Sequence, residues 1–442
     1  MEGRIMESLL IRHIEDISEK WVKLLLKHRV DFPDLAHHDH KDFGPQECHH
    51  HRRPSPSDTG VVAKCPSQDK LAGFSSTRAT VRVEYDVESD AVAQGGKRRT
   101  RKETFVVKVV PTVGNMANLL ITEGMHHIEV GQYDNFLRTL SMWEQERRRT
   151  SRTDGRSKWT KAMVGDIIPA HALAISTEDY FTLVMPDLRH LGYQTKFLEE
   201  GLSDAEVLIV AETIGRFHGT VVAYKLVTQL DLQKSFPRCF HVADVESPMF
   251  TYFPKAGFER LRQEWCDKPH RATLLELLTP YEEQVASLVV ENLLPREPFA
   301  TAIHGDIQPT NIFFKKTSDG KYNIKLIDWA LARYSQGTYD LIYLLSIGVE
   351  PEVRRRVSRQ ARDVYFKAFN SALTDLDAGL SYPREQFEKD MVISEHLSVI
   401  WSISSINLLF SSPSLQRRLT CVIKDVVLNP NLPPLRSISN NI

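Results

Sequence analysis

Two polar motifs that lie close together in the sequence hold the side chains best suited to catalysis. The first is "IHGDIQPTN", in which Asp306 follows His304 and Gly305 and precedes Asn311 by five residues. The second is "IKLIDWA", in which Asp328 follows an apolar run. Transfer of a phosphoryl group from ATP needs an acceptor hydroxyl held in line and a divalent metal that neutralises the phosphate oxygens. The two motifs supply side chains for both tasks.

Each polar side chain of these motifs can be given a role in that reaction. One carboxylate must orient the acceptor hydroxyl or accept its proton, and Asp306 suits this role. Magnesium prefers oxygen ligands, which the Asn311 amide and the Asp328 carboxylate provide. The alternative is structural, with Asp306 in a turn, Asn311 as a cap and Asp328 as a helix N-cap. Each structural role is reasonable singly, but their combination favours phosphoryl transfer.

A lone lysine, Lys108, stands in the apolar segment "ETFVVKVVP", roughly 200 residues before these motifs. A buried ammonium group costs several kcal/mol unless an anion pairs with it. The functional interpretation gives Lys108 a bound phosphate and a carboxylate from the next helical stretch, either Glu123 or Glu129. The structural alternative places Lys108 on an edge strand, where its ammonium group reaches water.

The segment "LAGFSSTRA" is a candidate phosphate-covering loop just before the first strand pattern. Backbone amides and the hydroxyls of Ser75, Ser76 and Thr77 could contact a phosphate chain there. Gly73 is the only glycine of this segment, so an ordinary loop is the alternative.

The hydrophobic pattern predicts the elements that must position these residues. Helical spacing over residues 7–28 predicts an amphipathic helix that lays its apolar face on a larger body. The alternation in "ATVRVEYDV", followed by "ETFVVKVVP", predicts an antiparallel pair of strands. Residues 123–147 are predicted to be helical, "RRRTSRTDGRSK" to be a solvated basic loop, and "YFTLVMPDL" to be a buried strand. After about residue 200 the pattern is mostly helical.

A β-rich first part and a helical second part predict an α+β fold with two lobes. We expect an N-terminal helix and His-rich linker over 1–60 and a nucleotide-binding lobe over 61–188. A helical lobe with the catalytic loop and the metal site would cover 189–442. The linker, "DLAHHDHKDFGPQECHHHRRPSPSDTG", is too poor in aliphatic residues to join a core. Its histidines and Cys48 could bind zinc, but without a rigid frame we expect only weak, nonspecific binding.

Composition places the chain among ordinary globular proteins. It is 42% hydrophobic and 26% charged with a formal net charge of −1, which offers no electrostatic case for binding nucleic acid. No stretch reaches the ~18 apolar residues of a membrane span, and the N-terminus lacks the apolar core of a signal peptide. The five cysteines are odd in number and widely spaced, as expected of free thiols in a reducing compartment. We therefore expect a cytoplasmic protein without an obligate protein partner.

The motifs resemble those of the aminoglycoside phosphotransferase and choline kinase-like superfamily, within the protein-kinase-like fold. The ecdysteroid kinase-like branch is the most similar. The resemblance rests on His304-Gly305-Asp306, Asn311 and Ile327-Asp328-Trp329. It extends over roughly residues 70–350 through "FVVKVVP", "EVGQY", "LVMPDL", "IGRFHG" and "GTYDLIYLL".

The resemblance implies a role for each matched position. Asp306 would be the catalytic base, while Asn311 and Asp328 would hold Mg²⁺. Lys108 would grip the phosphates of ATP, with Glu129 orienting it.

Two departures from the family pattern concern the nucleotide. Pro186 stands in "LVMPDL" where the branch usually has a glutamate, so the adenine contacts would come from the Pro186 carbonyl and the Leu188 N–H. The loop at Gly73 is poor in glycine, a second departure that concerns the cover over the phosphates.

Other matched positions are expected to be structural. His304 would brace its loop through backbone hydrogen bonds, and His218 would be a satisfied core histidine. Asp340 is expected to be a helix N-cap that, in the implied fold, also steadies the catalytic loop.

A small hydroxylated molecule is the expected acceptor. Protein kinases carry a lysine two residues after the catalytic aspartate and a long activation segment that ends in A-P-E. Here Gln308 occupies the first position, and only eleven residues separate Asp328 from Asp340. Residues 190–300 and 350–420 would contact the acceptor, and the aromatic residues of the first range suggest a sterol or other lipid-like alcohol. The alternatives are a choline, ethanolamine or aminoglycoside acceptor, or a catalytically impaired binding protein.

Overall fold

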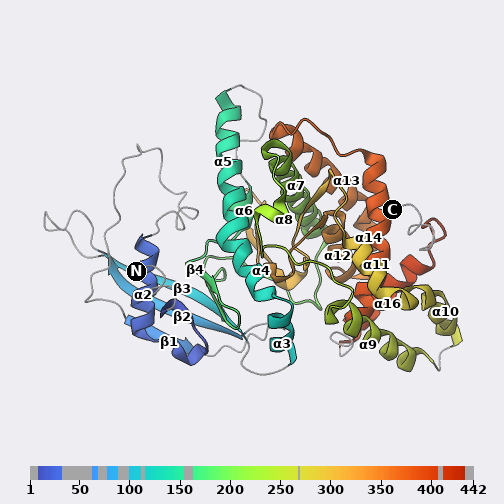
Figure 1. Cartoon of the computed structure of the whole chain (residues 1–442), viewed down its shortest axis with the longest axis horizontal. Helices are drawn as coiled ribbons and strands as arrows, with labels where there is room; N and C mark the ends of the chain where they lie inside the picture. The colour runs from blue at the N-terminus through green and yellow to red at the C-terminus, as the bar shows by residue number, and fades with distance from the viewer. Residues whose placement is uncertain are drawn as a thin grey trace. The chain divides into compact units, whose positions relative to one another are not determined.

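The structure is a computed structural model of the whole chain (Figure 1). It describes residues 8–31, 62–67, 77–87, 99–110, 115–153, 163–266, 269–406 and 412–433. The whole His-rich linker, together with Gly73, Ser75 and Ser76, lies outside the described residues. The chain forms two compact units. Unit 1 comprises residues Met1–Arg138 and Gly165–Gln194, and unit 2 comprises Thr139–Val164 and Thr195–Ile442.

Unit 1 contains a five-stranded sheet in which every neighbouring pair is antiparallel, in the order β1-β2-β3-β5-β4. The strands are β1 (Val62–Ser67), β2 (Thr77–Val87), β3 (Arg99–Val109), β4 (Leu173–Ser176) and β5 (Phe181–Pro186). The predicted pairing of the two central strands is confirmed: Val81 lies opposite Phe105, and Ala79 lies opposite Val107. The alternating pattern turns these side chains to one face, where all four are buried.

The N-terminal segment is not the single helix predicted over residues 7–28. A short 3₁₀ turn, η1 (Ile14–Asp16), precedes helix α2 (Glu19–Asp31). The break has a local cause, because the Ser18 hydroxyl accepts a hydrogen bond from the Trp21 N–H and caps the start of α2. The predicted packing is nevertheless confirmed. The apolar side chains of this segment share one buried cluster with those of β2 and β3, including Leu9, Ile14, Trp21, Val81, Phe105 and Val107.

Helices α3 (Asn115–Thr122), α4 (Met125–Gly131) and α5 (Leu137–Thr153) follow β3, with a π-helical turn (Gln132–Phe136) between α4 and α5. Since α5 continues to Thr153, the first half of the basic segment predicted as a loop is helical. Arg148 is buried there and donates to Glu144, one turn earlier, at 2.8 Å. The other Glu144 oxygen accepts the backbone N–H groups of Met163 and Val164, at the start of the short helix α6 (Val164–Ile167).

Unit 2 is built around two 25-residue helices that lie side by side, α7 (Asp204–Thr228) and α13 (Pro351–Asp375) (Figure 1). Helix α7 begins with a capping box in which Ser203 and Glu206 exchange hydrogen bonds. Gly215 and Gly219 let the two backbones touch. A Cβ atom would lie 2.6 Å from the Tyr365 carbonyl oxygen at the first position and 2.3 Å from that of Phe369 at the second.

Two short antiparallel ladders carry the sequence motifs in unit 2. Strand β6 (Ala300–Ile303) pairs with β9 (Arg333–Gln336), and β7 (Ile312–Lys316) pairs with β8 (Tyr322–Leu326). The 3₁₀ turns η5 (Pro309–Asn311) and η6 (Trp329–Leu331) connect them. The remaining helices are α8 (Leu232–Ser235), α9 (Pro248–Trp265), α10 (Pro269–Glu283), α11 (Val285–Leu293), α12 (Thr338–Ile347), α14 (Arg384–Ser404) and α16 (Pro413–Val427).

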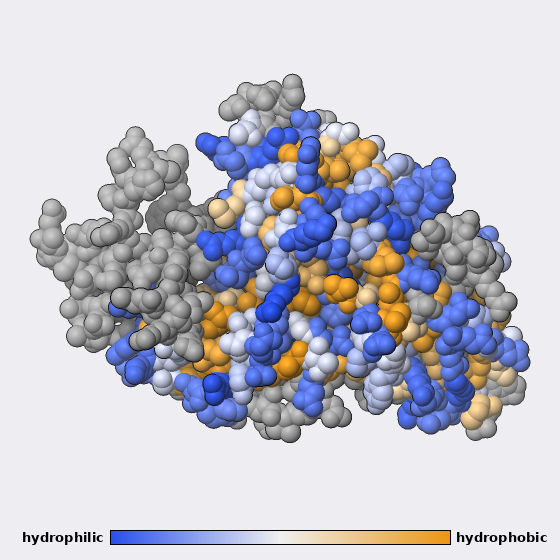
Figure 2. All heavy atoms as spheres, viewed as in Figure 1, coloured by the Kyte–Doolittle hydropathy of each residue, from blue (hydrophilic) through white to orange (hydrophobic). Residues whose placement is uncertain are grey.

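The predicted α+β class is confirmed, because the sheet occupies unit 1 and helices dominate unit 2. Hydrophilic side chains cover much of the visible face of the described residues, with hydrophobic patches between them (Figure 2). Among the described residues, no helix combines the length and the apolar character required to cross a membrane.

Candidate active site

The loop from Ile303 to Asn311, here named the Asp306 loop, leaves β6 through a sharp turn. Gly305 has φ +83°, a left-handed conformation that favours glycine. A Cβ atom at this position would also lie 2.2 Å from the backbone oxygen of Leu331. Both the backbone angle and the close approach therefore require glycine between His304 and Asp306.

Three side chains hold the carboxylate of Asp306. The Tyr343 hydroxyl donates to Oδ1 at 2.8 Å, while the amides of Asn311 and Gln308 donate to Oδ2 at 2.8 and 3.0 Å. The pKa of Asp306 is raised to about 6, mainly by burial; the Asp328 carboxylate also raises it, and the three donors oppose both effects. The carboxylate is fixed in orientation and more basic than an ordinary aspartate.

Asp340 organises the backbone of the same loop. Its two oxygens accept the N–H groups of His304 and Gly305 at 2.7 and 2.9 Å. Asp340 is not the N-cap of its helix, as one sequence interpretation had it: it lies inside α12, whose N-cap is Gly337. Its carboxylate points to the Asp306 loop instead.

His304 and His218 both have structural surroundings. His304 Nε2 contacts the Ile327 carbonyl at 2.9 Å, and its Nδ1 accepts the Asp306 N–H at 3.3 Å. Burial lowers the pKa of His304, so the neutral ring with the proton on Nε2 satisfies both contacts. His218 is fully buried, with Nδ1 2.8 Å from the Tyr365 hydroxyl and Nε2 3.3 Å from Asp340.

Asn311 and Asp328 lie on neighbouring segments that a backbone hydrogen bond connects. The Ile327 N–H donates to the Asn311 carbonyl at 3.0 Å. The Asn311 side-chain NH₂ group donates to Asp306. The amide oxygen, which is the atom that a hard cation would bind, therefore points away from Asp306. Asp328 has φ +68°, a costly conformation for a non-glycine residue that is typical of functional positions.

This donor set fits a magnesium ion that is also bound by phosphate oxygens. One amide oxygen and one carboxylate leave most of an octahedral shell to phosphate and water, the arrangement that Mg²⁺ favours. Within the described residues, no group of three or more His, Cys, Asp or Glu side chains is placed to hold a metal by itself.

Lys108 occupies the middle of the unit 1 sheet, since it lies opposite Arg78 on β2 and Leu183 on β5. Its side chain is 3% exposed, which excludes the edge-strand alternative. Of the two candidate partners, Glu129 on α4 receives the ammonium group, with both carboxylate oxygens within 2.8 Å of Nζ. The pair is preformed and buried.

The predicted adenine-contacting segment lies at the end of β5. Pro186 is the last residue of that strand, opposite Phe105, and Leu188 follows it in a buried turn. The Asp187 N–H donates to the Thr104 carbonyl, and its side chain accepts from Arg189 and His190, which fixes the turn. The Leu188 N–H makes no hydrogen bond within the described residues, so a ligand can use it.

Sequence reasoning missed Tyr343 and Gln308 as partners of Asp306. Gln308 was considered only as a departure from the protein-kinase pattern. Tyr343 lies three residues after Asp340, and this spacing brings two residues to the same side of a helix. That periodicity was the available signal, because a helix that presents Asp340 to the loop also presents Tyr343.

A series of aromatic rings connects Tyr343 to the strand that precedes the loop. Tyr343 stacks on Tyr339 at 6.0 Å, and Trp401 then meets Tyr339 and Phe250 edge-on at 6.0 and 6.1 Å. The Arg333 guanidinium lies over the Phe250 ring at 5.5 Å, and Arg333 itself pairs with Ile303. We name Tyr339, Tyr343, Trp401 and Phe250 the aromatic series. Tyr343 and Trp401 are partly exposed.

Solved structures that are similar to this chain are phosphotransferases of low sequence identity. An ethanolamine kinase from Plasmodium vivax is 12% identical, with 84% of this chain and 83% of that one covered and a TM-score of 0.40. A choline kinase from Cryptosporidium parvum Iowa II is 12% identical, with coverages of 86% and 93% and a TM-score of 0.41. The GDP complex of aminoglycoside 2'-phosphotransferase-IIIa is 12% identical, with coverages of 91% and 97% and a TM-score of 0.36. No curated protein sequence matches.

The family assignment rests on the sequence model of a family and not on these distant structures. The model of the ecdysteroid kinase-like family matches residues 70–378, which is more than half of the chain. The matched range contains Lys108, Glu129, Asp306, Asn311 and Asp328. The chain belongs to the ecdysteroid kinase-like family.

Proposed function

We propose that this protein is an ATP-dependent kinase that transfers the γ-phosphoryl group to a hydroxyl of a small alcohol. The observation that carries the proposal is the Asp306 carboxylate, which three side-chain donors hold beside Asn311 and Asp328. A turn residue or a cap does not need three side chains to orient it. The family assignment supports phosphoryl transfer as the reaction.

In this proposal Asp306 acts on the acceptor. The Asp306 carboxylate orients the acceptor hydroxyl and accepts the hydroxyl proton. At the same time the hydroxyl oxygen bonds to the γ-phosphorus, and the bond between that phosphorus and the bridging oxygen of ADP breaks. Tyr343, Asn311 and Gln308 keep the carboxylate from rotating away, which preserves the geometry that in-line transfer requires.

Asn311 and Asp328 would hold magnesium, which neutralises charge on the phosphate oxygens when it is bound with ATP. In unit 1, Lys108 would contact the nucleotide phosphates, and Glu129 fixes the direction of its ammonium group. The Pro186 carbonyl and the Leu188 N–H would hold adenine. Ser75 and Ser76 would cover the phosphates.

The aromatic series supports an acceptor with an apolar body. Its partly exposed members are Trp401 and Tyr343, and Tyr343 itself donates to Asp306, so an apolar acceptor could lie against these rings near the proposed base. Phe250 is fully buried with the Arg333 guanidinium over its ring, so it would support the series without contacting the acceptor. We therefore propose a neutral alcohol, such as a sterol or another lipid-like molecule.

The experiment is a product search with γ-labelled ATP. The full chain, with Mg²⁺, is incubated with a panel that contains sterols, long-chain alcohols, choline, ethanolamine and kanamycin, and the labelled product is identified by mass spectrometry. We expect label in a neutral alcohol and none with the Asp306→Asn variant. ATP and Mg²⁺ binding in a thermal-shift assay without any labelled product, from the panel or from metabolite extracts, would instead identify a catalytically impaired binding protein.

A further inference from the structure

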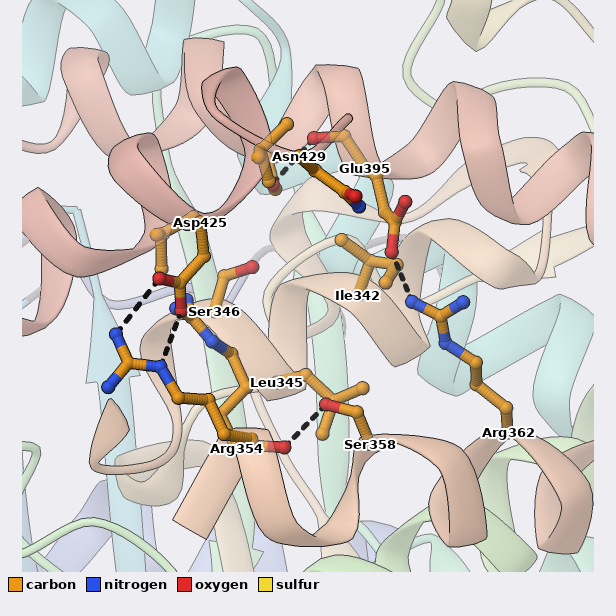
Figure 3. Close-up of a pocket in the computed structure, with 13 residues that line it drawn as sticks. Ile342, Leu345, Ser346, Arg354, Ser358, Arg362, Glu395, Asp425 and Asn429 are labelled. Carbon is orange, nitrogen blue, oxygen red and sulfur yellow. Dashed lines mark hydrogen bonds and ion pairs between the residues drawn. The ribbon is translucent and has the colours of Figure 1, made fainter. Parts of the chain in front are cut away.

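A cavity of about 170 Å³ lies among α12, α13, α14 and α16 of unit 2 (Figure 3). Its floor is apolar and includes Ile342, Leu345 and Val422. Its walls are charged. In the close-up, Arg354 and Asp425 lie toward one end, and the pair of Arg362 and Glu395 lies at the other. None of these side chains belongs to the set around Asp306.

The charges on the cavity walls do not balance. Three guanidinium groups, from Arg354, Arg355 and Arg362, face two carboxylates, from Asp425 and Glu395, which leaves one positive unit. Arg354 and Arg355 both bind the same carboxylate, that of Asp425. One carboxylate can neutralise only one guanidinium, and the side chain of Arg354 is only 11% exposed. Burial lowers the pKa of Arg354, which reflects the cost of its charge there.

The cavity also contains donors without acceptors. Ser346 is 5% exposed and lines the cavity from α12, and its hydroxyl makes no hydrogen bond within the described residues. Arg362 donates to Glu395, but its Nε is buried without an acceptor in the described part of the chain. A buried donor without an acceptor, such as Arg362 Nε, is unfavourable, so natural proteins rarely leave one without a reason. An oxyanion at the Arg354 end of the cavity would give the Ser346 hydroxyl an acceptor and supply the missing charge.

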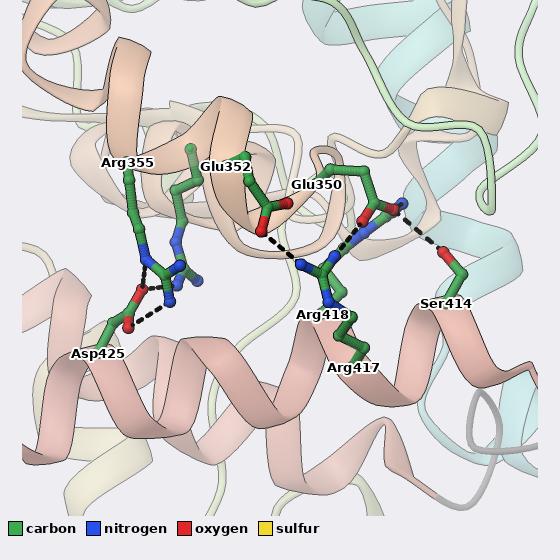
Figure 4. Close-up of polar contacts among 8 residues, drawn as sticks. Glu350, Glu352, Arg355, Ser414, Arg417, Arg418 and Asp425 are labelled. Atoms are coloured by element: carbon green, nitrogen blue, oxygen red, sulfur yellow. Dashed lines mark hydrogen bonds and ion pairs between the residues drawn. The ribbon is translucent and has the colours of Figure 1, made fainter.

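The wall formed by α16 is held in place independently of any ligand (Figure 4). Arg418, which is almost fully buried, donates to the carbonyls of Leu198 and Ile347 at 2.8 and 2.6 Å and pairs with Glu350 at the start of α13. Ser414 also donates to Glu350, at 3.0 Å. These contacts keep the cavity open between α13 and α16, so a ligand would meet a preformed site.

We propose that this cavity binds a small organic anion, with a phosphate or carboxylate group between Arg354, Arg355 and Ser346 and a short apolar part on the floor. Guanidinium groups match both oxyanions because their N–H groups form a planar fork. The site is separate from the proposed kinase reaction and does not depend on it. Ile342 and Leu345 of the cavity floor belong to α12, the helix that carries Tyr343 and Asp340. An occupant would therefore contact an element of the proposed active site.

The test is calorimetric titration of the full chain with three probes: inorganic phosphate, phenyl phosphate and benzoate. Saturating ADP and Mg²⁺ are present so that a nucleotide site cannot take up the probe. The informative variant is Arg355→Gln, because the Arg355 side chain is 52% exposed and its loss leaves the Arg354–Asp425 pair in place. The matched control is Arg356→Gln, one residue away, which removes the same charge from an exposed pair with Asp204 outside the cavity.

We expect phenyl phosphate to bind at one site in the wild type and in Arg356→Gln, and more tightly than inorganic phosphate because of the apolar floor. Arg355→Gln should weaken this binding about tenfold or more, the scale of one hydrogen bond to a charged group. Ser346→Ala, which removes a hydroxyl without breaking a bond, should weaken it as well. Equal affinity in Arg355→Gln and Arg356→Gln, or no saturable binding of any probe to the wild type, would overturn the proposal.

Discussion

The hydroxyl of Tyr343 donates a hydrogen bond to Asp306 Oδ1 at 2.8 Å, which connects α12 to a loop 37 positions earlier. This contact fixes the one carboxylate oxygen that neither Asn311 nor Gln308 holds. The same helix binds the backbone of the loop through Asp340. Helix α12 therefore positions both the main chain and the side chain of the proposed base.

Tyr343→Phe should lower kcat by about tenfold or more, because a hydrogen bond to a charged group contributes about 1.5–3 kcal/mol. The KM for ATP should change little, since the contact is to Asp306 and not to the nucleotide. Steady-state kinetics separate the two constants. Tyr322→Phe on β8, whose hydroxyl makes no hydrogen bond within the described residues, is the control and should leave both unchanged. Equal kcat in the two variants would show that Tyr343 does not position Asp306.

Gly305→Ala should abolish activity and destabilise unit 2, because the new methyl group meets the Leu331 backbone oxygen at 2.2 Å. Gly320→Ala is a matched control. Gly320 has nearly the same backbone angle, φ +82°, and nothing within 4 Å of the added atom. It should lose only about 1 kcal/mol from backbone strain and keep full activity. Thermal unfolding and turnover measured on both variants distinguish strain from the steric clash.

Asp328→Asn should abolish Mg²⁺-dependent turnover and leave the thermal stability nearly unchanged, because the metal loses its charged ligand while the side chain keeps its size. Asp306→Asn should lower the rate about 100-fold or more, with ATP affinity retained. Turnover and Mg²⁺-dependent ATP binding are measured together. Wild-type activity in Asp328→Asn would contradict the proposed function.

Lys108→Ala should weaken ATP use and also destabilise unit 1. Removal of one partner from the buried pair leaves the Glu129 carboxylate uncompensated, at a cost of about 3–5 kcal/mol. The double variant Lys108→Met with Glu129→Gln should regain most of the stability without regaining activity. Recovery of activity in the double variant would mean that the pair is purely structural.

Stability should depend on pH through Glu206. Burial alone would raise the pKa of Glu206, but hydrogen bonds from Lys196 and Ser203 outweigh it and hold the pKa below its usual value. A lowered folded pKa contributes stability above the unfolded value of about 4.3, and this contribution is lost as pH falls through the folded pKa. Glu206→Gln should therefore lower Tm at pH 7, and this difference from the wild type should disappear as pH falls through the folded pKa of Glu206. Glu212→Gln, on the exposed side of α7, should show no such difference.

Sequence reasoning predicted the fold class and the burial of Lys108 because these follow from patterns along the chain. Alternation placed Val81 and Phe105 on one buried face, and a lone lysine between valines required an anionic partner. The hydrophobic pattern alone could not choose between Glu123 and Glu129, since that choice depends on the direction of α4 relative to the sheet; the family resemblance indicated Glu129, which pairs with Lys108. It also started the first helix too early. The Ser18 hydroxyl caps the start of α2 at a point where the helical spacing of apolar residues continues unbroken.

The contacts of the candidate site were less predictable than its residues. Asp306, Asn311 and Asp328 were recognisable because the proposed reaction limits which side chains could perform it. Tyr343 was missed because a tyrosine among apolar helical residues is usually part of a core. The cap role predicted for Asp340 on local grounds was wrong, whereas its second predicted role, steadying the catalytic loop, came from the family resemblance and is confirmed by its hydrogen bonds to the backbone of His304 and Gly305. Local patterns identify chemical groups, and tertiary structure assigns their partners.

The contact of α7 with α13 at Gly215 and Gly219 also sets the order in which unit 2 should open. Backbones that touch leave no room for water, so the amide hydrogens along this contact should exchange with deuterium only when the whole unit unfolds. His218 lies between the two glycines, and through Asp340 it is connected to the backbone of the Asp306 loop. The slowest-exchanging part of the unit would then extend from this helix pair to the amides of His304 and Gly305. The proposed base, Asp306, would then be attached to the part of unit 2 that unfolds last.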